Sequence, residues 1–146
     1  MASRVWLKRA VRAAVLTGTT AALPAWSLGL GELELQSFLN QPLRARLEVL
    51  DVRDLTVDDI RIRLAGVEDF ERLGVERGYF LTGIQFDLEI EPGSSVGSIR
   101  LSSEEPVVEP YLDLVVEARW PRGRLLREYT VLLDPPPVRR EAVTVS

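Results

Sequence analysis

The chain contains no cysteine and no histidine, and its only lysine is Lys8. Without cysteine and histidine it forms no Ser-His-Asp or Cys-His catalytic group, no thiolate metal site and no imidazole zinc site. Lys8 lies in a segment that we expect to be removed after export, so Schiff-base chemistry is excluded too. The lack of cysteine also means that no disulfide supports the fold, and the apolar core must hold it alone.

Neighbouring carboxylates occur as the pairs Asp58-Asp59, Glu68-Asp69 and Glu104-Glu105. A glycosidase needs two carboxyl groups that face each other across a sugar, about 5–10 Å apart. Adjacent residues of a strand point to opposite faces, so none of these pairs suffices alone. The D-x-D-x-D-G spacing of a calcium loop is absent as well. We therefore predict that the chain is not an enzyme and has no catalytic, cofactor-binding or metal-binding residue.

The chain also lacks an apolar run long enough for a comfortable membrane span of about 20 residues. Its main apolar stretch is "AAVLTGTTAALPAW" at residues 13–26, and basic residues precede it, namely Arg4, Lys8, Arg9 and Arg12. Ala25 and Ser27 then occupy the −3 and −1 positions of a cleavage site. This order predicts a secretory signal peptide at residues 1–27. An uncleaved anchor or a wrongly assigned start are the alternatives.

Acidic residues dominate the chain after residue 27. Removal of residues 1–27 leaves 119 residues with 14 basic and 22 acidic side chains, and the net charge changes from −4 to −8. An acidic domain repels phosphate backbones, so we predict no nucleic-acid partner. About 119 residues are enough to bury roughly two thirds of the unfolded surface in one core.

Apolar and polar residues alternate with a period of two along most of this part, which predicts β-strands. The clearest strands are expected at 42–50, 59–64, 83–90 and 111–120, and further ones at 32–39, 98–102 and 125–133. Val115 interrupts the alternation of 111–120, which indicates that the outer face of this strand is partly covered. The sequences "EPGSSVGS" (91–98) and "WPRGRL" (120–125) are typical of hairpin loops.

One helix is predicted in "AGVEDFERLGVERG" (65–78), with Phe70 and Leu73 on one face and Gly74 as its end. At "LTVDDI" (55–60) a helix capped by Thr56 is conceivable, but the alternation that follows favours a strand. The predicted fold is therefore all-β with one short helix, an immunoglobulin-like sandwich of about seven strands. A small β-barrel is the competing fold.

We expect three segments: the signal peptide 1–27, the sandwich domain 28–134 and a proline-rich tail 135–146. Three prolines follow Asp134. Proline donates no backbone hydrogen bond, so these residues end the last strand and begin a stiff, extended segment. An ordinary ragged carboxyl terminus is the alternative.

Four side chains are candidates for a surface that contacts a partner or a glycan. Trp120 precedes Pro121 at a strand end, where it either stacks on a sugar or closes the rim of the core. Tyr111 stands at a strand start. Arg124 and Arg127 flank two leucines, an arrangement suited to an acidic partner. The other arginines of the strands are expected to be solvated and to pair with acidic residues across strands.

Three stretches together resemble the N-terminal domain of the FimV family: "LGLGELELQSFLNQPLRARLEVLDVRDL" (28–55), "IRIRLAGVEDFERLGVERGYFLTGIQFDL" (60–88) and "WPRGRLLREYTVLLDPP" (120–136). The family consists of bacterial polar-hub proteins of type IV pilus assembly and twitching motility. The resemblance implies a β-rich periplasmic domain. In the family this domain is followed by a proline-rich linker, a peptidoglycan-binding LysM motif, one membrane helix and an acidic cytoplasmic region.

Residues 138–146 are too short for a LysM motif or a membrane span, so those functions are not carried over. We expect a truncated form, a fragment or a stand-alone relative. The predicted function is non-catalytic binding of envelope or pilus-assembly proteins in the periplasm, through an edge strand at 84–90 or 125–133. The alternatives are a module that binds peptidoglycan or another glycan through Trp120 and Tyr111, a carboxylate enzyme, and a relative that has lost its function.

Overall fold

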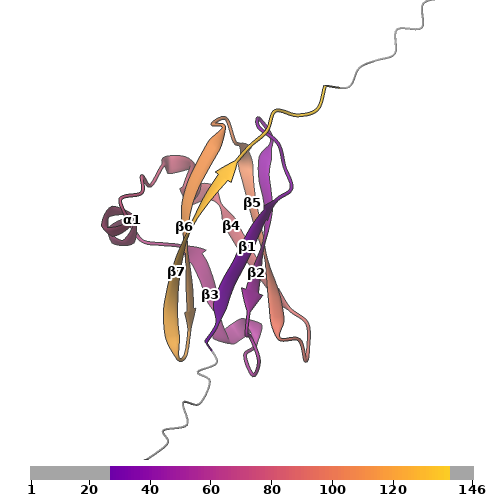
Figure 1. Ribbon diagram of the computed structural model, residues 1–146, viewed down its shortest axis with the longest axis vertical. Helices are drawn as coiled ribbons and strands as arrows, with labels where there is room; N and C mark the ends of the chain where they lie inside the picture. Colours follow the sequence, from indigo (N-terminus) through magenta and orange to yellow (C-terminus); the bar gives the residue numbers. More distant parts are fainter. Residues whose placement is uncertain (1–26, 139–146) are drawn as a thin grey trace, which may run out of the picture.

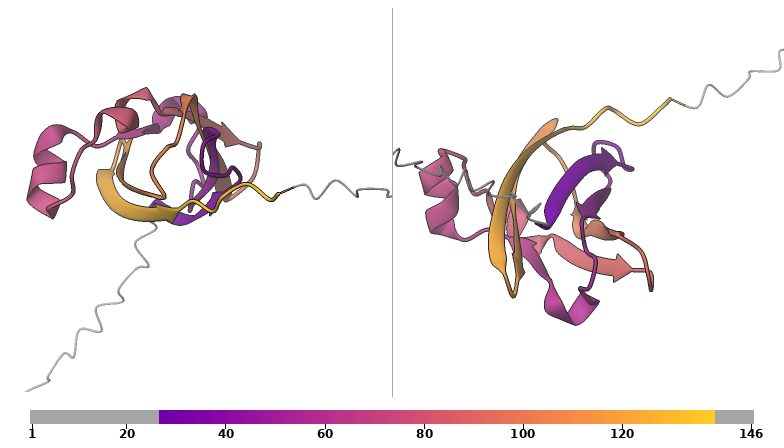
Figure 2. Two further views of the ribbon diagram at one scale, coloured as in Figure 1. Left: turned by 90° about the horizontal axis from the view of Figure 1, so that it is seen from above. Right: turned by 60° about the horizontal axis from the view of Figure 1, so that its bottom comes forward.

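The computed structural model describes residues 27–138. Seven strands form two antiparallel sheets that face each other (Figures 1 and 2), as the sequence predicted. The four-stranded sheet has the order β1-β2-β5-β4 and the three-stranded sheet the order β3-β6-β7. No ladder joins the two sheets within this part of the chain, so the molecule is a sandwich and not the competing barrel. The expected signal peptide lies, apart from its last residue, outside the described residues, as do residues 139–146 of the expected tail.

The strands of the four-stranded sheet are β1 (Gly29–Leu35), β2 (Pro42–Leu50), β4 (Gln85–Ile90) and β5 (Val96–Pro106). Those of the three-stranded sheet are β3 (Arg61–Leu64), β6 (Tyr111–Trp120) and β7 (Gly123–Leu132). Hairpins join β4 to β5 and β6 to β7, at the two loops that the sequence indicated.

The core lies between the sheets and follows the predicted alternation. In β2 every second residue is buried, and Leu47 and Val49 have no exposed surface. Their partners in the neighbouring strand β5 include Ile99, which is also fully buried. Because one face of β2 supplies the core, its other face remains exposed and carries charged side chains.

The predicted helix is present as α1 (Val67–Leu73), and it ends at Gly74, whose φ of 70° is left-handed. Phe70 and Leu73, expected on one face of the helix, differ in burial. Phe70 is fully buried, whereas Leu73 is 45% exposed. The inward residues of this two-turn helix are Asp69 and Phe70, and Leu73 is its last residue, where the chain turns away at Gly74.

Two short 3-10 helices, η1 (Val57–Asp59) and η2 (Tyr79–Gly83), precede β3 and β4. The Thr56 amide donates to Oδ2 of Asp59 at 2.8 Å, so η1 is capped at the threonine considered in the sequence, and the strand begins only at Arg61. None of the helices in residues 27–138 is long and apolar enough to cross a bilayer.

Helix α1 lies outside the three-stranded sheet, on the side away from the other sheet (Figures 1 and 2). Val115 on the outer face of β6 is fully buried. The Ala65 amide, just before α1, donates to the carbonyl of Val115 at 2.9 Å. The covered outer face that Val115 indicated is therefore confirmed, and it creates a second, partly enclosed layer in which polar residues meet.

Candidate functional site

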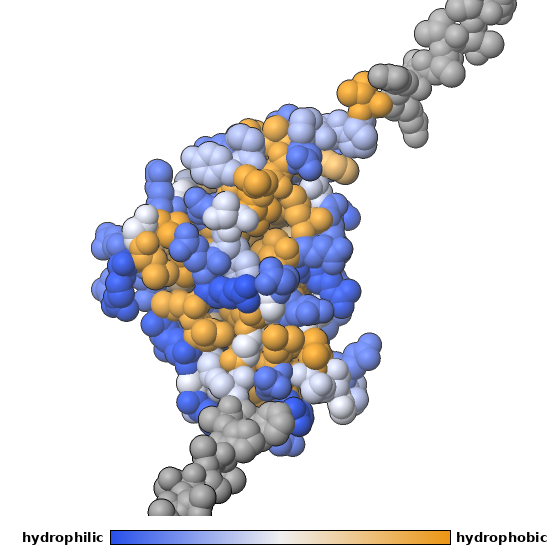
Figure 3. All heavy atoms as spheres, in the orientation of Figure 1, coloured by the Kyte–Doolittle hydropathy of each residue, from blue (hydrophilic) through white to orange (hydrophobic). Residues whose placement is uncertain are grey.

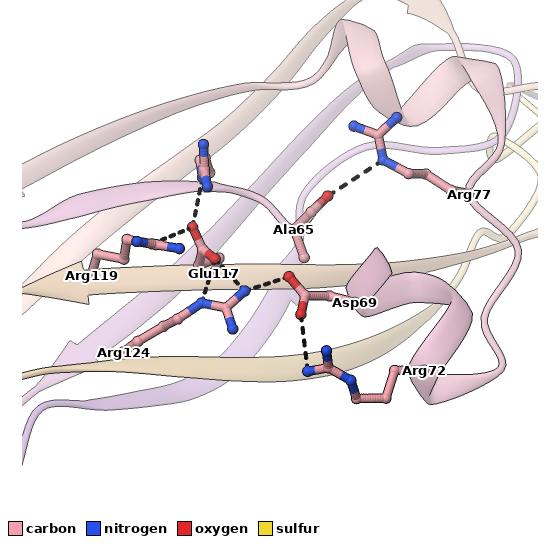
Figure 4. A network of polar contacts seen from close by, with 8 residues as sticks. Ala65, Asp69, Arg72, Arg77, Glu117, Arg119 and Arg124 are labelled. Carbon is pink, nitrogen blue, oxygen red and sulfur yellow. Dashed lines mark hydrogen bonds and ion pairs between the residues drawn. The ribbon is translucent and has the colours of Figure 1, made fainter. Parts of the chain in front are cut away.

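A fully buried carboxylate, Glu117, lies on this outer face of β6. Strand register places Arg63 of β3 directly opposite it. The Nε atoms of Arg63 and Arg119 donate to its Oε1 at 2.6 and 3.0 Å, and Nε of Arg124 donates to Oε2 at 2.6 Å (Figure 4). Three strands thus contribute one guanidinium each to a single carboxylate.

The network continues onto α1 through Asp69, which is 7% exposed. Arg124 donates to Oδ2 of Asp69, and Arg72 of the same helix lies 3.6 Å from Oδ1 (Figure 4). Arg77, just after α1, donates to the carbonyl of Ala65 at 3.3 Å. Arg124 therefore joins the sheet to the helix, because it binds a carboxylate of each.

Burial alone would raise the pKa of Glu117, but the hydrogen bonds from Arg63, Arg124 and Arg119 outweigh it and lower the pKa to about 2. The bonds to Glu117 and Asp69 raise the pKa of Arg124. Glu117 and Arg124 are therefore both ionised at neutral pH. A carboxylate held in this way neither releases nor accepts a proton near pH 7, so the cluster is suited to electrostatic positioning and not to acid–base catalysis.

An open pocket of about 440 Å³ lies beside the network. Four arginines line it, namely Arg63, Arg72, Arg119 and Arg124, together with the first turn of α1 and the carboxylates of Glu68 and Asp69. The residues 27–138 contain no group of three or more side chains arranged to hold a metal ion. We call this pocket with its four arginines the arginine pocket.

The two predicted arginines lie in different places. Arg124 belongs to the arginine pocket, whereas Arg127 faces β1 in the other sheet. Arg127 donates to the carbonyl of Leu30, pairs with Glu32 at 3.2 Å, and its guanidinium carbon lies 5.0 Å from the ring centre of Tyr129. Both guanidinium groups are thus engaged within the domain itself.

Tyr129 completes this link between the edge strands β7 and β1. Its hydroxyl donates to the carbonyl of Gly31 at 2.8 Å, and burial raises its pKa to about 12. On the face shown in Figure 3, a hydrophilic band separates apolar patches. Because Arg127 and Tyr129 donate to the carbonyls of Leu30 and Gly31, their side chains cover the backbone of β1 where its pairing with β2 is irregular, between Leu30 and Leu33.

The structure does not bring Trp120 and Tyr111 together. They are the two ends of β6, nine residues or about 30 Å apart. Trp120 is half-buried against the core, and it packs over Gly123, where an added Cβ would approach its ring to 3.0 Å. Tyr111 is 54% exposed and lines an open pocket with Tyr79 at the other end of the domain. The single aromatic surface expected for a glycan is not formed.

Both strands predicted as possible edges are edges: β4 of the four-stranded sheet and β7 of the three-stranded sheet. Side chains bridge β7 to β1, and β3 is only four residues long. In the described part of the chain β4 pairs with β5 alone, and Gln85, Asp87 and Glu89 on its outer face are exposed. Strand β4 is thus the longer edge without such a bridge.

The sequence predicted that Arg63 pairs with an acidic residue across strands. It predicted neither the burial of Glu117 nor the ion pair between Asp69 and Arg124. Period two places Glu117 on the outer face, which usually means solvent. The signal that was available is Val115, two residues earlier on the same face, because it showed that something covers the strand there. Nothing in the sequence placed α1 over that point.

The chain matches the family described as "FimV N-terminal domain Ig-like domain" over residues 28–136. It is 50% identical to "Motility hub protein FimV" of Pseudomonas aeruginosa, in the strains PAO1 and UCBPP-PA14. The aligned region has 133 residues and covers 90% of this chain. The chain spans only 14% of the length of those relatives. No solved structure matches it. The chain therefore belongs to the family of FimV N-terminal Ig-like domains, and the immunoglobulin-like sandwich predicted from its sequence is confirmed.

Proposed function

We propose that this domain is a non-catalytic protein-binding module of a motility or pilus-assembly apparatus in the periplasm, and that a partner strand binds to the edge of β4. One observation carries the proposal. Strand β4 is an edge strand, and no other described segment forms a ladder with its backbone on the side away from β5. The relatives named as motility hub proteins support the cellular setting. The predicted signal peptide supports export.

The edge of β4 has the chemistry that strand addition needs. In a six-residue strand, alternate residues direct their N–H and C=O groups away from β5, so about three residues present unpaired groups. Each new backbone hydrogen bond contributes a net of about 1 kcal/mol. Such an edge gives modest affinity alone, and pockets for side chains must supply the specificity.

The outer face of β4 indicates the charge of its partner. Asp87 and Glu89 are exposed there, and Glu89 already pairs with Arg100 of β5 at 3.2 Å. Asp87 lies opposite the same Arg100 in the strand register. A strand added to this edge is stabilised by lysine or arginine at the position beside Asp87, since opposite charges in neighbouring strands attract.

The absence of catalysis is also part of the proposal. The chain has no histidine or cysteine, and the carboxylate most affected by its surroundings, Glu117, is held ionised by three arginines. The glycan alternative loses its proposed surface because Trp120 and Tyr111 lie at opposite ends of β6.

Site-specific photo-cross-linking tests the proposal. A photoreactive phenylalanine analogue replaces Gln85 on β4 or, as the control, Arg44, which is exposed on the inner strand β2. Each variant is exported in a bacterium with type IV pili and irradiated. We expect an adduct with a pilus-assembly or envelope protein at Gln85 and none at Arg44. Equal adducts at both positions, or none at either, would refute binding at β4.

A further inference from the structure

Two arginines of the arginine pocket, Arg119 and Arg124, belong to a row of like charges that crosses the three-stranded sheet. Strand register places Arg61 opposite Arg119 and Arg119 opposite Arg124, so three arginines follow one another across three strands. Like charges directly opposite each other in a sheet are destabilising. Glu117 compensates part of this repulsion from the neighbouring row, since it binds Arg119 and Arg124.

Two of these arginines retain donors for a ligand. Arg63 and Arg119 each use Nε to bind Glu117, and their side chains are 62% and 52% exposed. Within residues 27–138 neither has an acidic partner other than Glu117. Their terminal NH₂ groups are thus left beside the open pocket, and the carboxylate that orients them is fully buried. A guanidinium fixed through Nε is preorganised to bind a second oxyanion.

The charge of the pocket is opposite to that of the domain. Residues 27–138 carry 12 arginines, no lysine and 21 acidic residues, a net charge of −9. In the pocket four arginines meet three carboxylates, those of Glu68, Asp69 and Glu117, which leaves it positive. A local positive site on an acidic domain selects for a small number of negative charges presented at one point.

The geometry points to a binding site for the carboxylate side chains of an acidic protein segment, in the arginine pocket between α1 and the outer face of β3, β6 and β7. In this site the NH₂ groups of Arg63 and Arg119 donate to the bound carboxylate, and Arg72, which also lines the pocket, contributes a further positive charge. The net charge of −9 disfavours an extended polyanion such as a nucleic acid or an anionic membrane, whose other charges would face the rest of the domain. A short acidic segment avoids that repulsion.

This inference rests on the proposed function in one respect, that the partner is a protein, but it concerns the other sheet and not β4. The two proposals can therefore fail separately. If β4 gives no cross-links while the pocket binds acidic peptide, only the proposal about the edge is lost. If acidic peptide does not bind while β4 is cross-linked, only the present inference is lost.

The test is a fluorescence-polarisation titration of the purified chain with a labelled peptide, acetyl-Gly-Glu-Asp-Glu-Asp-Gly-amide, at low and at physiological salt. The matched peptide has Gln and Asn in place of Glu and Asp. We expect saturable binding of the acidic peptide alone, and weaker binding at the higher salt concentration. Inorganic phosphate and vesicles that contain phosphatidylglycerol are titrated as competitors.

The variant Arg63→Gln/Arg119→Gln is expected to bind the acidic peptide at least about tenfold more weakly, because both guanidinium groups that hold the carboxylate are lost. The control Arg44→Gln/Arg46→Gln changes the net charge equally, on the outer face of β2, and is expected to stay within about twofold of the parent chain. If the first variant does not fold by circular dichroism, Arg72→Gln, whose side chain is 69% exposed, is compared with Arg44→Gln instead.

Three results would overturn the inference. The first is no saturable binding of the acidic peptide, and the second is an equal loss in the pocket variants and the controls. The third is stronger binding of the phosphatidylglycerol vesicles or of phosphate than of the peptide, which would assign the pocket to another anion.

Discussion

Replacement of Glu117 by glutamine is expected to destabilise the domain by about 2 kcal/mol at pH 7. The fall in its pKa from 4.5 to about 2 corresponds to about 3 kcal/mol in favour of the ionised form. Solvent screening reduces this, because the three arginines are 36–62% exposed and remain hydrated when the negative charge is removed. Glutamine keeps the shape of the side chain and one acceptor oxygen, and its NH₂ group faces a guanidinium donor, so the change removes the charge together with one acceptor.

The destabilisation is expected to depend on pH in one direction. The pKa of Glu117 is lower in the folded than in the unfolded chain, so its contribution is complete above about pH 4.5 and is lost as the pH falls towards 2. At pH 3, less than about half of the difference between the parent chain and the variant should remain.

Urea unfolding followed by circular dichroism at pH 7, 5 and 3 measures both effects. The control is Glu128→Gln, which removes the same charge from an exposed position on the outer face of β7. We expect this control to change the free energy of unfolding by less than about 0.5 kcal/mol. The reasoning is refuted if Glu117→Gln behaves like the control at pH 7, or if its effect does not shrink at pH 3.

Three further substitutions test the layers around this network. Phe70→Ala removes the fully buried ring of α1 and is expected to cost about 3 kcal/mol or more in the same urea assay, a loss that would be absent if α1 did not pack on the sheet. Tyr129→Phe removes the bond to Gly31 and is expected to cost about 1 kcal/mol, with faster amide exchange in β1; unchanged exchange would contradict the bridge between β7 and β1. Trp120→Ala is expected to lower stability by about 2 kcal/mol and to leave co-sedimentation with peptidoglycan sacculi unchanged, whereas selective loss of co-sedimentation would restore the glycan interpretation.

The alternation of side chains was sufficient to predict the strands and the sandwich. In β2 the apolar residues Leu43, Ala45, Leu47 and Val49 are all buried, because a strand between two sheets directs every second residue to the core. The hairpin loops and the glycine that ends α1 followed from local backbone preferences. These features depend on residues that are near one another in sequence, so they can be deduced without knowledge of the tertiary fold.

The candidate site was predicted less well, because it depends on contacts between distant segments. Glu117 is 54 residues from Arg63, and Arg124 is 55 residues from Asp69. Period two assigned Glu117 to the outer face correctly, but an outer face is buried only where another element covers it. The seven residues of α1 provide that cover, and a sequence does not show where so short a helix will pack.

Glu117 connects the stability of the domain to the proposed binding of acidic segments, and the two respond to its charge with opposite sign. Its carboxylate stabilises the fold because it neutralises Arg63, Arg119 and Arg124. By the same neutralisation it weakens the attraction of those arginines for a second carboxylate. Glu117→Gln should therefore unfold at a lower urea concentration and yet bind the acidic peptide more tightly. A variant that loses stability and affinity together would contradict this prediction, and would show that the orientation Glu117 gives to Arg63 and Arg119 outweighs the negative charge it adds to the pocket.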